Sequence, residues 1–297
     1  MKILVTGPGR LGGPLLAELG RRGASGAVLC RSGVSPLPAG WRSVRADVTR
    51  PESLVGVCAD CEAVLHLAAV THTNAAARYD EVNALGTEHL VAEARRAGVQ
   101  RFVLVSTRAI SPQGGAYSRS KIRAEAIVRE SGMSWSIVRP AEVYGTGGEG
   151  ISALIDRCRR GRWIPVVGDG SARLAPIYLD DVVAGIGEVV LAPRVGAVEA
   201  LAGPEEMTLL ELIARLGAYF RTSPSIVRVP AGLLELAARG LALLPLRKPP
   251  LYVDQVARLL SPKTKDATPA GERFGFRARP LEAGLDALFR RPQGSPA

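Results

Sequence analysis

Tyr117 and Lys121 are the two residues of this chain whose types and spacing most directly suggest chemistry. They lie four positions apart at the start of a run, residues 121–129, that has helical character. In an α-helix this spacing places both side chains on one face, roughly 6 Å apart along the axis. A phenol has a pKa of ~10, and a nearby ammonium lowers it by favouring the phenolate, which makes a general acid/base. Taken alone, the spacing more often marks two solvated helix residues, so the surrounding elements must decide.

The composition is that of an ordinary globular protein. With 297 residues, 47% of them hydrophobic, the chain can bury one large core or two smaller ones. The residues before the first glycines show no signal-peptide pattern, so we expect a cytoplasmic protein. The net charge of +10 favours an anionic partner, but the densest basic cluster, residues 157–162, has no aromatic side chains interleaved for base stacking. We therefore expect no nucleic acid.

Neither the cysteines nor the longest apolar stretch indicates a metal site or a membrane span. Cys58 and Cys61 have the spacing of a metal half-site, but no second Cys/His pair at zinc spacing accompanies them, so they fit core or helix-end cysteines. Residues 231–246 are mostly apolar but are interrupted by Glu235 and Arg239 and are too few to cross a bilayer. We expect a helix packed on its own domain, with a surface-seeking amphipathic helix as the alternative.

A glycine turn follows the first predicted strand. Residues 2–6 form a short apolar run, residues 7–13 read Gly-Pro-Gly-Arg-Leu-Gly-Gly, and residues 14–22 fit a helix. In this context the motif predicts a dinucleotide site. The glycines allow a tight turn and the close approach of a pyrophosphate, and the helix N-terminus supplies amide donors.

The residues after the second predicted strand, 27–30, indicate which dinucleotide binds. Where an NAD-binding domain carries Asp or Glu for the ribose 2′-hydroxyl, this chain has Arg31 and Ser32. A guanidinium suits a 2′-phosphate and offers no carboxylate to a free hydroxyl. NADP(H) is therefore predicted to be preferred over NAD(H).

Strands and helices alternate through the first half of the chain. Further strands are predicted over residues 43–46, 63–69, 101–107 and 135–138, with helices starting near residue 51 and covering residues 81–97 and 121–129. This alternation predicts an α/β fold with a doubly wound parallel (Rossmann) sheet. Ligands of such sheets bind at the carboxyl ends of the strands, where Gly7, Ala69, Thr107 and Pro140 lie.

The pattern changes after residue 145. Glycines at 147, 148 and 150 form a break, and the residues beyond it fit helices over 151–160 and 180–191 and strands over 164–167 and 198–202. We expect a second, smaller, mainly helical substrate lobe. Residues 1–147 and 175–203 are assigned to the dinucleotide-binding domain and residues 148–174 and 204–297 to the substrate lobe, with a disordered tail from Arg291.

Eight short motifs then occur in an order and spacing that are specific. They are the glycine turn, Asp47-Val48-Thr49, His66-Leu67-Ala68-Ala69, Val82-Asn83 with Gly86-Thr87, Arg101-Phe102-Val103 leading into Val105-Ser106-Thr107, Tyr117 with Lys121, Arg139-Pro140 with Val143-Tyr144-Gly145, and Pro176-Ile177-Tyr178-Leu179-Asp180-Asp181. Over nearly its whole length the chain resembles the extended or atypical short-chain dehydrogenase/reductases, the NAD(P)-dependent epimerase/dehydratase superfamily.

The resemblance implies a catalytic set and a cofactor site. Tyr117 corresponds to the family's proton donor and acceptor, Lys121 to the residue that binds the nicotinamide ribose and lowers the Tyr pKa, and Thr107 to the residue that hydrogen-bonds the substrate oxygen. The implied reaction is hydride transfer between the nicotinamide and a carbinol or carbonyl carbon. The residues implied at the cofactor are Gly7, Gly9, Arg10, Leu11, Gly12, Arg31, Ser32, Asp47, Val48, Leu67, Ala68, Ala69, Tyr117, Lys121, Pro140 and Val143. Those implied at the substrate are Thr71, Glu142 and Arg173, and no metal is implied.

Three departures from the family pattern bear on the function. A single residue, Pro8, separates the first two glycines, where the family usually has two residues. Glu142 stands where sugar-nucleotide members often carry Asn, and its charge would repel a diphosphate, whereas Arg173 matches the family's substrate-phosphate arginine. Arg108 follows Thr107 in place of the Asp-Glu pair of many dehydratases, which argues against dehydration.

We therefore expect an NAD(P)-dependent oxidoreductase or epimerase that acts on a hydroxyl/carbonyl centre with Tyr117 as general acid/base. The alternative is a non-catalytic NADPH-binding accessory or sensor protein of the same fold; intact Thr107, Tyr117 and Lys121 favour the enzyme. The predicted partner is a small-molecule substrate, either anionic or hydrophobic, and the sequence does not separate a reductase from an epimerase. Membrane association is not expected, and a homodimer is left open.

Overall fold

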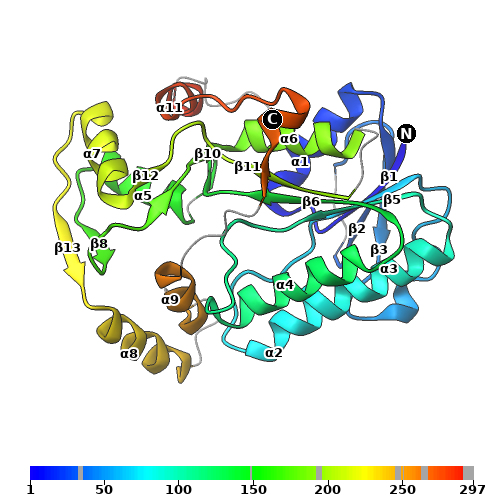
Figure 1. The fold of residues 1–297 in the computed structure, drawn as a ribbon, viewed down its shortest axis with the longest axis horizontal. Coiled ribbons are helices and arrows are strands. Elements are labelled where there is room, and N and C mark those ends of the chain that lie inside the picture. The colour runs from blue at the N-terminus through cyan, green and yellow to red at the C-terminus, as the bar shows by residue number, and fades with distance from the viewer. Residues whose placement is uncertain are drawn as a thin grey trace.

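A parallel β-sheet of eight strands forms the centre of the molecule. The computed structural model describes residues 1–32, 36–147, 149–191, 196–244, 249, 251–261 and 267–289. The strand order is β14-β11-β6-β5-β4-β1-β2-β3, with every neighbouring pair parallel (Figure 1). These strands are β1 (Lys2–Thr6), β2 (Ser25–Cys30), β3 (Trp41–Arg45), β4 (Ala63–His66), β5 (Arg101–Val105), β6 (Ser134–Pro140), β11 (Ala197–Leu201) and β14 (Thr268–Pro269). The strand order reverses beside β1, so the predicted doubly wound Rossmann sheet is confirmed.

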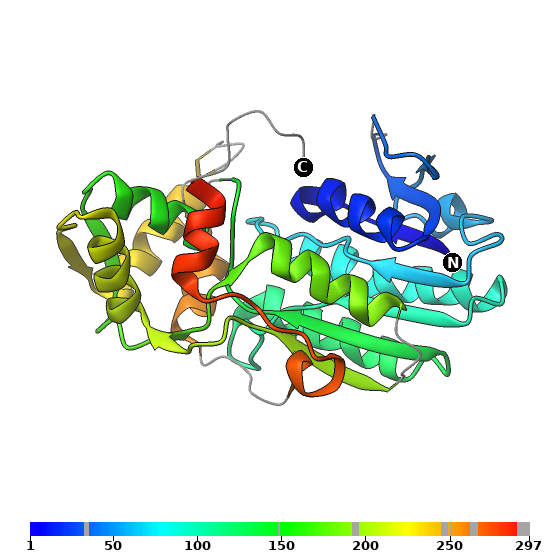
Figure 2. The same ribbon diagram turned by 90° about the horizontal axis from the view of Figure 1, so that it is seen from above.

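Helices cover both faces of this sheet, as Figures 1 and 2 show from two sides. One face carries α1 (Gly9–Arg21) and α6 (Leu179–Leu191), which pack on each other. The other carries α2 (Ala76–Tyr79), η2 (Asp80–Leu85), α3 (Gly86–Arg96) and α4 (Gly115–Arg129). Buried apolar side chains fill both interfaces, so β4 is buried throughout, as its unbroken apolar run predicts.

Several element ends differ from the prediction. β4 stops at His66, and beyond it the Asn83 side chain binds both backbone groups of Val70: Oδ1 accepts from its N–H (2.8 Å) and Nδ2 donates to its carbonyl (3.1 Å). α1 begins at Gly9 and includes Pro14, whose missing N–H removes a single hydrogen bond near the helix start. The helix predicted from residue 51 is only a 3₁₀ turn, η1 (Pro51–Leu54).

A smaller lobe has its own core. It is built from α5 (Ile151–Arg159), α7 (Leu209–Phe220), α8 (Ala231–Ala242), α9 (Val253–Leu260), α11 (Leu281–Phe289) and the two-stranded pairs of β7 (Val143–Tyr144) with β10 (Ile177–Tyr178), β8 (Ile164–Val167) with β13 (Ile226–Val229), and β9 (Arg173–Leu174) with β12 (Met207–Thr208). Its centre contains Tyr144, Ile155, Leu212 and Leu285. One part of the range predicted for this lobe belongs elsewhere: β14 pairs with β11 in the main sheet and leads into α10 (Ala270–Phe274). The predicted disordered tail from Arg291 lies outside the described residues.

Helix α8 forms where the apolar stretch predicts a helix. The expectation that this helix packs on its own domain is wrong for one of its sides, which is exposed. Ala238 is the only fully buried residue of α8, and Leu233 and Leu236 are 59% and 68% exposed. The helix has apolar residues all around, and the lobe covers only one side of it. Within the described residues, no helix is both long and apolar enough to cross a membrane.

Candidate functional site

The glycine turn joins β1 to α1 at the carboxyl edge of the sheet. Gly7 has φ +60°, and a Cβ there would overlap the backbone of Ala68 at the end of β4. Gly9 has φ +45° with open space where a side chain would be, and Gly12 lies so close to Pro8 that a Cβ would overlap its ring. The shortened loop therefore still makes a tight turn, and its open side faces the first amides of α1, which have no helical partner.

A cavity of about 450 Å³ adjoins this turn. It is lined by eight of the predicted cofactor residues, Gly7, Gly9, Arg31, Ser32, Asp47, Val48, Ala68 and Ala69, and also by Arg78, which the sequence did not suggest. A glycine cradle, a helix N-terminus and two guanidinium groups form a donor set that fits a dinucleotide with an anionic ribose substituent.

Asp47 is held as a carboxylate in this cavity. Its Oδ1 accepts from the backbone N–H and the hydroxyl of Thr49, at 3.0 and 2.8 Å. Burial alone would raise the pKa of Asp47, but these hydrogen bonds and the positive charges of Arg31 and Arg78 lower it overall. The Asp47 carboxylate is turned toward Thr49 in its own turn. The charged side chains that remain to face the cavity are the cationic ones of Arg31 and Arg78.

Tyr117 and Lys121 lie one turn apart on α4, beside the end of β5. Lys121 Nζ donates to the carbonyl of Val105 (3.0 Å), two residues before Thr107. Thr107 Oγ1 accepts from the N–H of Ala109 (3.0 Å), so its O–H proton can still be donated. The structure thus gathers all three predicted catalytic residues at the carboxyl edge of the sheet.

The Tyr117 ring is enclosed by residues that the sequence did not suggest. The Tyr79 ring meets it edge-on with centroids 5.8 Å apart, and the Arg258 guanidinium carbon lies 4.4 Å from its centroid. Asp254, on the same helix α9 as Arg258, accepts from the Tyr117 backbone N–H (3.2 Å). α9 therefore caps the start of α4 and covers the phenol, which is only 6% exposed.

The expected lowering of the Tyr117 pKa by Lys121 is not what the structure gives. Burial raises the pKa of Tyr117 to about 12, because the phenolate loses its water, while the positive charge of Arg258 acts in the opposite direction. Burial also lowers the pKa of Lys121 to about 8, against the opposing charge of Glu125. The largest electrostatic influence on both groups is loss of solvent.

A larger cavity, of about 940 Å³, lies between the nucleotide-binding domain and the smaller lobe. Arg10, Thr71 and Val143, all predicted site residues, line it together with His72, Glu149, Ala153, Tyr252, Gln255 and Arg258. Arg258 Nη2 donates to the carbonyl of Thr71 (3.0 Å), and Arg10 Nη2 donates to that of Thr146 (2.7 Å). The hydrogen bonds of these two arginines thus connect the wall formed by the nucleotide-binding domain to the wall formed by the smaller lobe. Burial lowers the pKa of His72, and the charge of Arg258 adds to this effect.

The remaining predicted residues lie outside both cavities. Glu142 Oε2 accepts from the N–H of Ala175 (3.0 Å), and Arg173 forms an ion pair with Glu206 (Nε–Oε2 3.2 Å). Leu11 and Leu67 pack against the core on the α1 side, Gly12 packs on Pro8, and Pro140 ends β6. The structure does not bring the two proposed substrate residues Glu142 and Arg173 to the larger cavity.

Two kinds of functional residue were not predicted from the sequence. Asn83 is buried in η2, a π-helical turn, and its Nδ2 also donates to Ser120 Oγ (3.0 Å) on α4. A buried Asn inside an apolar helical run is a signal that could have been noticed. Arg78 and Arg258 carry no such signal, because their positions depend on how α2 and α9 pack.

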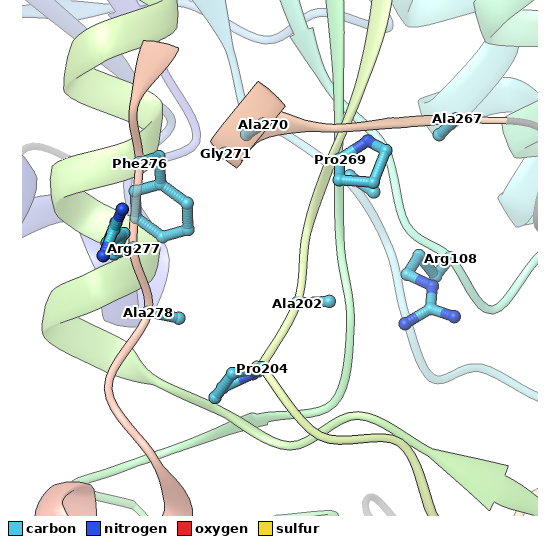
Figure 3. A pocket seen from close by; sticks show the side chains of 12 residues that line it. Arg108, Ala202, Pro204, Ala267, Pro269, Ala270, Gly271, Phe276, Arg277 and Ala278 are labelled. Atoms are coloured by element: carbon cyan, nitrogen blue, oxygen red, sulfur yellow. The ribbon is translucent and has the colours of Figure 1, made fainter. Parts of the chain in front are cut away.

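A separate cavity of about 540 Å³ lies at the β11–β14 edge of the sheet (Figure 3). Arg108 and Arg277 stand on opposite sides of it, with Pro269, Ala202 and Phe276 between them. None of the predicted cofactor or catalytic residues lines it. This cavity is therefore not part of the candidate site.

The Rossmann sheet with its glycine turn defines the class of dinucleotide-binding α/β folds. A model of the NAD dependent epimerase/dehydratase family matches residues 3–200, and the chain belongs to this family.

Relatives and solved structures agree with this assignment. Ceramide reductase of Caulobacter vibrioides (strain NA1000 / CB15N) is 29% identical over 80% of this chain and 76% of its own length. The 2-alkyl-3-oxoalkanoate reductase of Stenotrophomonas maltophilia (strain K279a) is 28% identical over 97% of this chain and 98% of its own. Among solved structures, MoeE5 in complex with UDP-glucose and NAD has a TM-score of 0.76 at 24% identity and covers 98% of both chains, a likeness of fold. Together these matches support an oxidoreductase or epimerase.

Proposed function

We propose that this protein is an NADP(H)-dependent ketoreductase that reduces a carbonyl group on a lipophilic substrate. The observation that carries the proposal is that Tyr117 and Lys121 lie on α4 beside the end of β5, with Arg258, which lines the larger cavity, over the Tyr117 ring. The two relatives described above are named as reductases of a ceramide and of a 2-alkyl-3-oxoalkanoate, both of which carry long apolar chains. Arg108 after Thr107 argues against a dehydratase.

The cofactor would be held by the glycine turn and by Arg31, Ser32 and Arg78, and when bound it supplies the hydride. Tyr117 and Thr107 would both donate hydrogen bonds to the carbonyl oxygen. As the carbonyl carbon gains hydride, Tyr117 gives its proton to the oxygen, so the ketone becomes an alcohol and the phenol becomes a phenolate. The positive charge of Arg258, which stacks on the Tyr117 ring, stabilises that phenolate until it regains a proton from solvent.

We further infer that the protein works in a reducing compartment such as the cytoplasm. Its four cysteines, Cys30, Cys58, Cys61 and Cys158, are all free. Burial raises the pKa of Cys58 to about 12, so this thiol is held protonated and unreactive.

The binding-only alternative has one observation in its favour, which is that α9 nearly covers Tyr117. The two functions are separated by Tyr117→Phe, assayed for NADPH oxidation with a panel of 2-alkyl-3-oxo acids, keto-sphingolipids, 3-oxosteroids and sugar nucleotides. The enzyme proposal predicts turnover of a lipophilic ketone that falls by about 10²–10⁴-fold in the variant, while NADPH affinity stays within a few-fold.

Tyr219→Phe is the matched control, because it removes the same hydroxyl from α7, where it donates to Asp286 (2.7 Å) in the smaller lobe. Its turnover should stay near that of the unmodified protein. NADPH binding without turnover of any member of the panel would support the binding-only function. Conversion of a sugar nucleotide to its epimer without net NADPH oxidation would instead indicate an epimerase.

A further inference from the structure

The outer side of the smaller lobe exposes a cluster of large apolar side chains. Of the described residues whose large apolar side chains are exposed, most lie on β13, α8 and α9 or just after α8: Ile226, Val227, Leu233, Leu236, Leu243, Leu244 and Leu259. Figure 1 shows β13 and α8 along the outer edge of the lobe, with α9 between α8 and α4. Monomeric soluble proteins rarely leave a contiguous apolar surface of this kind without a function.

The exposed side of α8 is apolar along its whole length. Leu233, Ala237 and Gly240 are spaced by four and three positions and so share one side of the helix, with Leu236 beside them, and Leu244 follows two residues past the helix end. The opposite side packs against the lobe through the buried Ala238. The two charged residues of α8, Glu235 and Arg239, are paired with each other (Nη2–Oε1 2.7 Å) at the flank of this stripe. No charge therefore interrupts it.

Basic and aromatic residues border this apolar surface. Arg228 is exposed on β13 between two valines. β8 pairs with β13 in parallel, with Ile164 opposite Ile226, so Trp163 lies next to the first residue of β13. Trp163 is half exposed, and the Arg157 guanidinium carbon lies 5.1 Å from its ring centroid. Leucines flanked by Trp and Arg are typical of segments that lie in a membrane interface.

We propose that the surface formed by β13 and α8 docks on an anionic lipid bilayer, with Leu233 and Leu236 inserted at the headgroup boundary. The net charge of +10 favours a negatively charged surface and disfavours a second copy of the same chain. The segment lies on the bilayer and does not cross it. This proposal revises the expectation from the sequence that the protein does not associate with membranes.

The docking surface also lies close to the proposed active site. α9 packs against both α8 and α4. A cavity of about 380 Å³ is lined by Glu235 of α8, Val256 and Ala257 of α9, and Tyr79 and Gly115. The Tyr79 ring contacts Tyr117, so this cavity lies beside the proposed proton donor. This link to a lipophilic substrate rests on the proposed function, whereas the docking itself does not.

The test is co-sedimentation of the full chain with vesicles, which needs neither cofactor nor substrate. Vesicles of phosphatidylcholine alone are compared with vesicles containing phosphatidylglycerol, at low and high salt. We expect binding to the anionic vesicles that weakens with salt. Leu233→Gln with Leu236→Gln should weaken it by at least about a hundredfold, because burying each leucine contributes roughly tenfold or more. Arg228→Gln should weaken binding only to the anionic vesicles.

Val55→Gln is the matched control, because Val55 is 69% exposed on the nucleotide-binding domain, outside the smaller lobe. It should bind vesicles as the unmodified protein does. Unchanged thermal unfolding verifies that the exposed substitutions leave the fold intact. The proposal is overturned if the unmodified protein stays in the supernatant, or if the control loses binding equally. Another contrary result would be a concentration-dependent dimer that is lost in the double leucine variant, with no vesicle binding. It would assign this surface to a second copy of the chain and overturn the proposal of bilayer docking.

Discussion

The electrostatics of the phenol depend on a residue far away in the sequence. Lys121 donates a hydrogen bond to the carbonyl of Val105, and the positive group stacked on the Tyr117 ring is Arg258. Arg258 is also paired with Asp254 (Nε–Oδ2 3.4 Å), whose negative charge raises the pKa of Tyr117. Arg258 therefore acts as a positioning and charge-balancing residue for the proposed acid.

Arg258→Met should raise the pKa of Tyr117, because it removes the positive charge and leaves that of Asp254. Alcohol oxidation needs the phenolate, so its rate at pH 9 should fall about tenfold for each unit by which the pKa rises. The measurement is the pH profile of oxidation with NADP⁺, whose rising limb should move to higher pH. Arg258→Lys, which keeps the charge, should move it less. A uniform loss at all pH values would contradict this role.

Arg31 and Arg78 should determine the choice of dinucleotide. Both line the cofactor cavity, and each charge-assisted hydrogen bond to a 2′-phosphate contributes ~1.5–3 kcal/mol. Arg31→Ser with Arg78→Gln should therefore weaken NADPH binding by at least about a hundredfold and leave NADH binding nearly unchanged. Titration calorimetry with both cofactors measures this, with Arg159→Gln in the smaller lobe as control. Tighter binding of NADH than of NADPH by the unmodified protein would refute the preference.

The sequence alone was enough for part of the site. Tyr117, Lys121 and Thr107 were singled out by the order of the family's motifs, and the structure gathers them near the end of β5 because they belong to one strand–helix unit. Arg258 could not, since it reaches Tyr117 only through the packing of α9 on α4. The direction of the Tyr117 pKa was missed for the same reason, because burial is a property of the folded chain.

At the scale of elements, β4 couples the sheet to α3 through His66. Its Nδ1 lies 2.6 Å from Thr6 Oγ1 and its Nε2 lies 3.1 Å from Thr87 Oγ1. Burial lowers the pKa of His66 to about 3, so the folded protein holds it neutral where the unfolded chain binds a proton.

This difference predicts acid sensitivity. Stability from His66 should be complete above about pH 6.5 and be lost as the pH falls toward 3, by about 2 kcal/mol between pH 7 and pH 5. Urea unfolding at both pH values measures it. His66→Asn should abolish this part of the pH dependence, whereas His89→Asn should keep it. Identical pH dependence in the unmodified protein and His66→Asn would contradict the assignment.

The glycine turn allows a second test at this scale. Gly7→Ala should destabilise the protein and weaken NADPH binding, since a Cβ would overlap Ala68 and φ is +60°. Gly20→Ala is the matched control, because Gly20 lies inside α1 and a Cβ there would meet nothing nearer than Trp41 Nε1 at 3.7 Å, so it should stabilise by about 0.5–1 kcal/mol. Thermal unfolding and NADPH titration distinguish them. Equal effects of the two substitutions would show that the turn is not the sensitive element.

The order of elements was predictable because apolar runs and glycines mark each one locally. Their ends were not: β4 ends at His66, and the backbone that follows it is bound at Val70 by the side chain of Asn83, which comes from a helix later in the chain. The parallel addition of β14 was also hidden, since a two-residue strand leaves no periodic pattern.

At the scale of the whole molecule, the smaller lobe completes the site. It contributes α9 over Tyr117 and most of the far wall of the larger cavity, while its outer surface carries the apolar stripe of α8. In the proposed ketoreductase, the cofactor site, the proton donor and the substrate entry come from different parts of one chain. The proposed ketoreductase requires that all three act in a single hydride transfer.

The most direct test of this central claim is to follow the hydride itself. NADPH that carries deuterium at the C4 position from which the hydride is transferred is incubated with the protein and a 2-alkyl-3-oxo acid or keto-sphingolipid. The mass of the product is then measured by mass spectrometry. We predict one deuterium on the carbinol carbon with the unmodified protein and almost none with Tyr117→Phe, although both bind NADPH. Tight NADPH binding without deuterium in any product would contradict hydride transfer and leave a cofactor-binding protein.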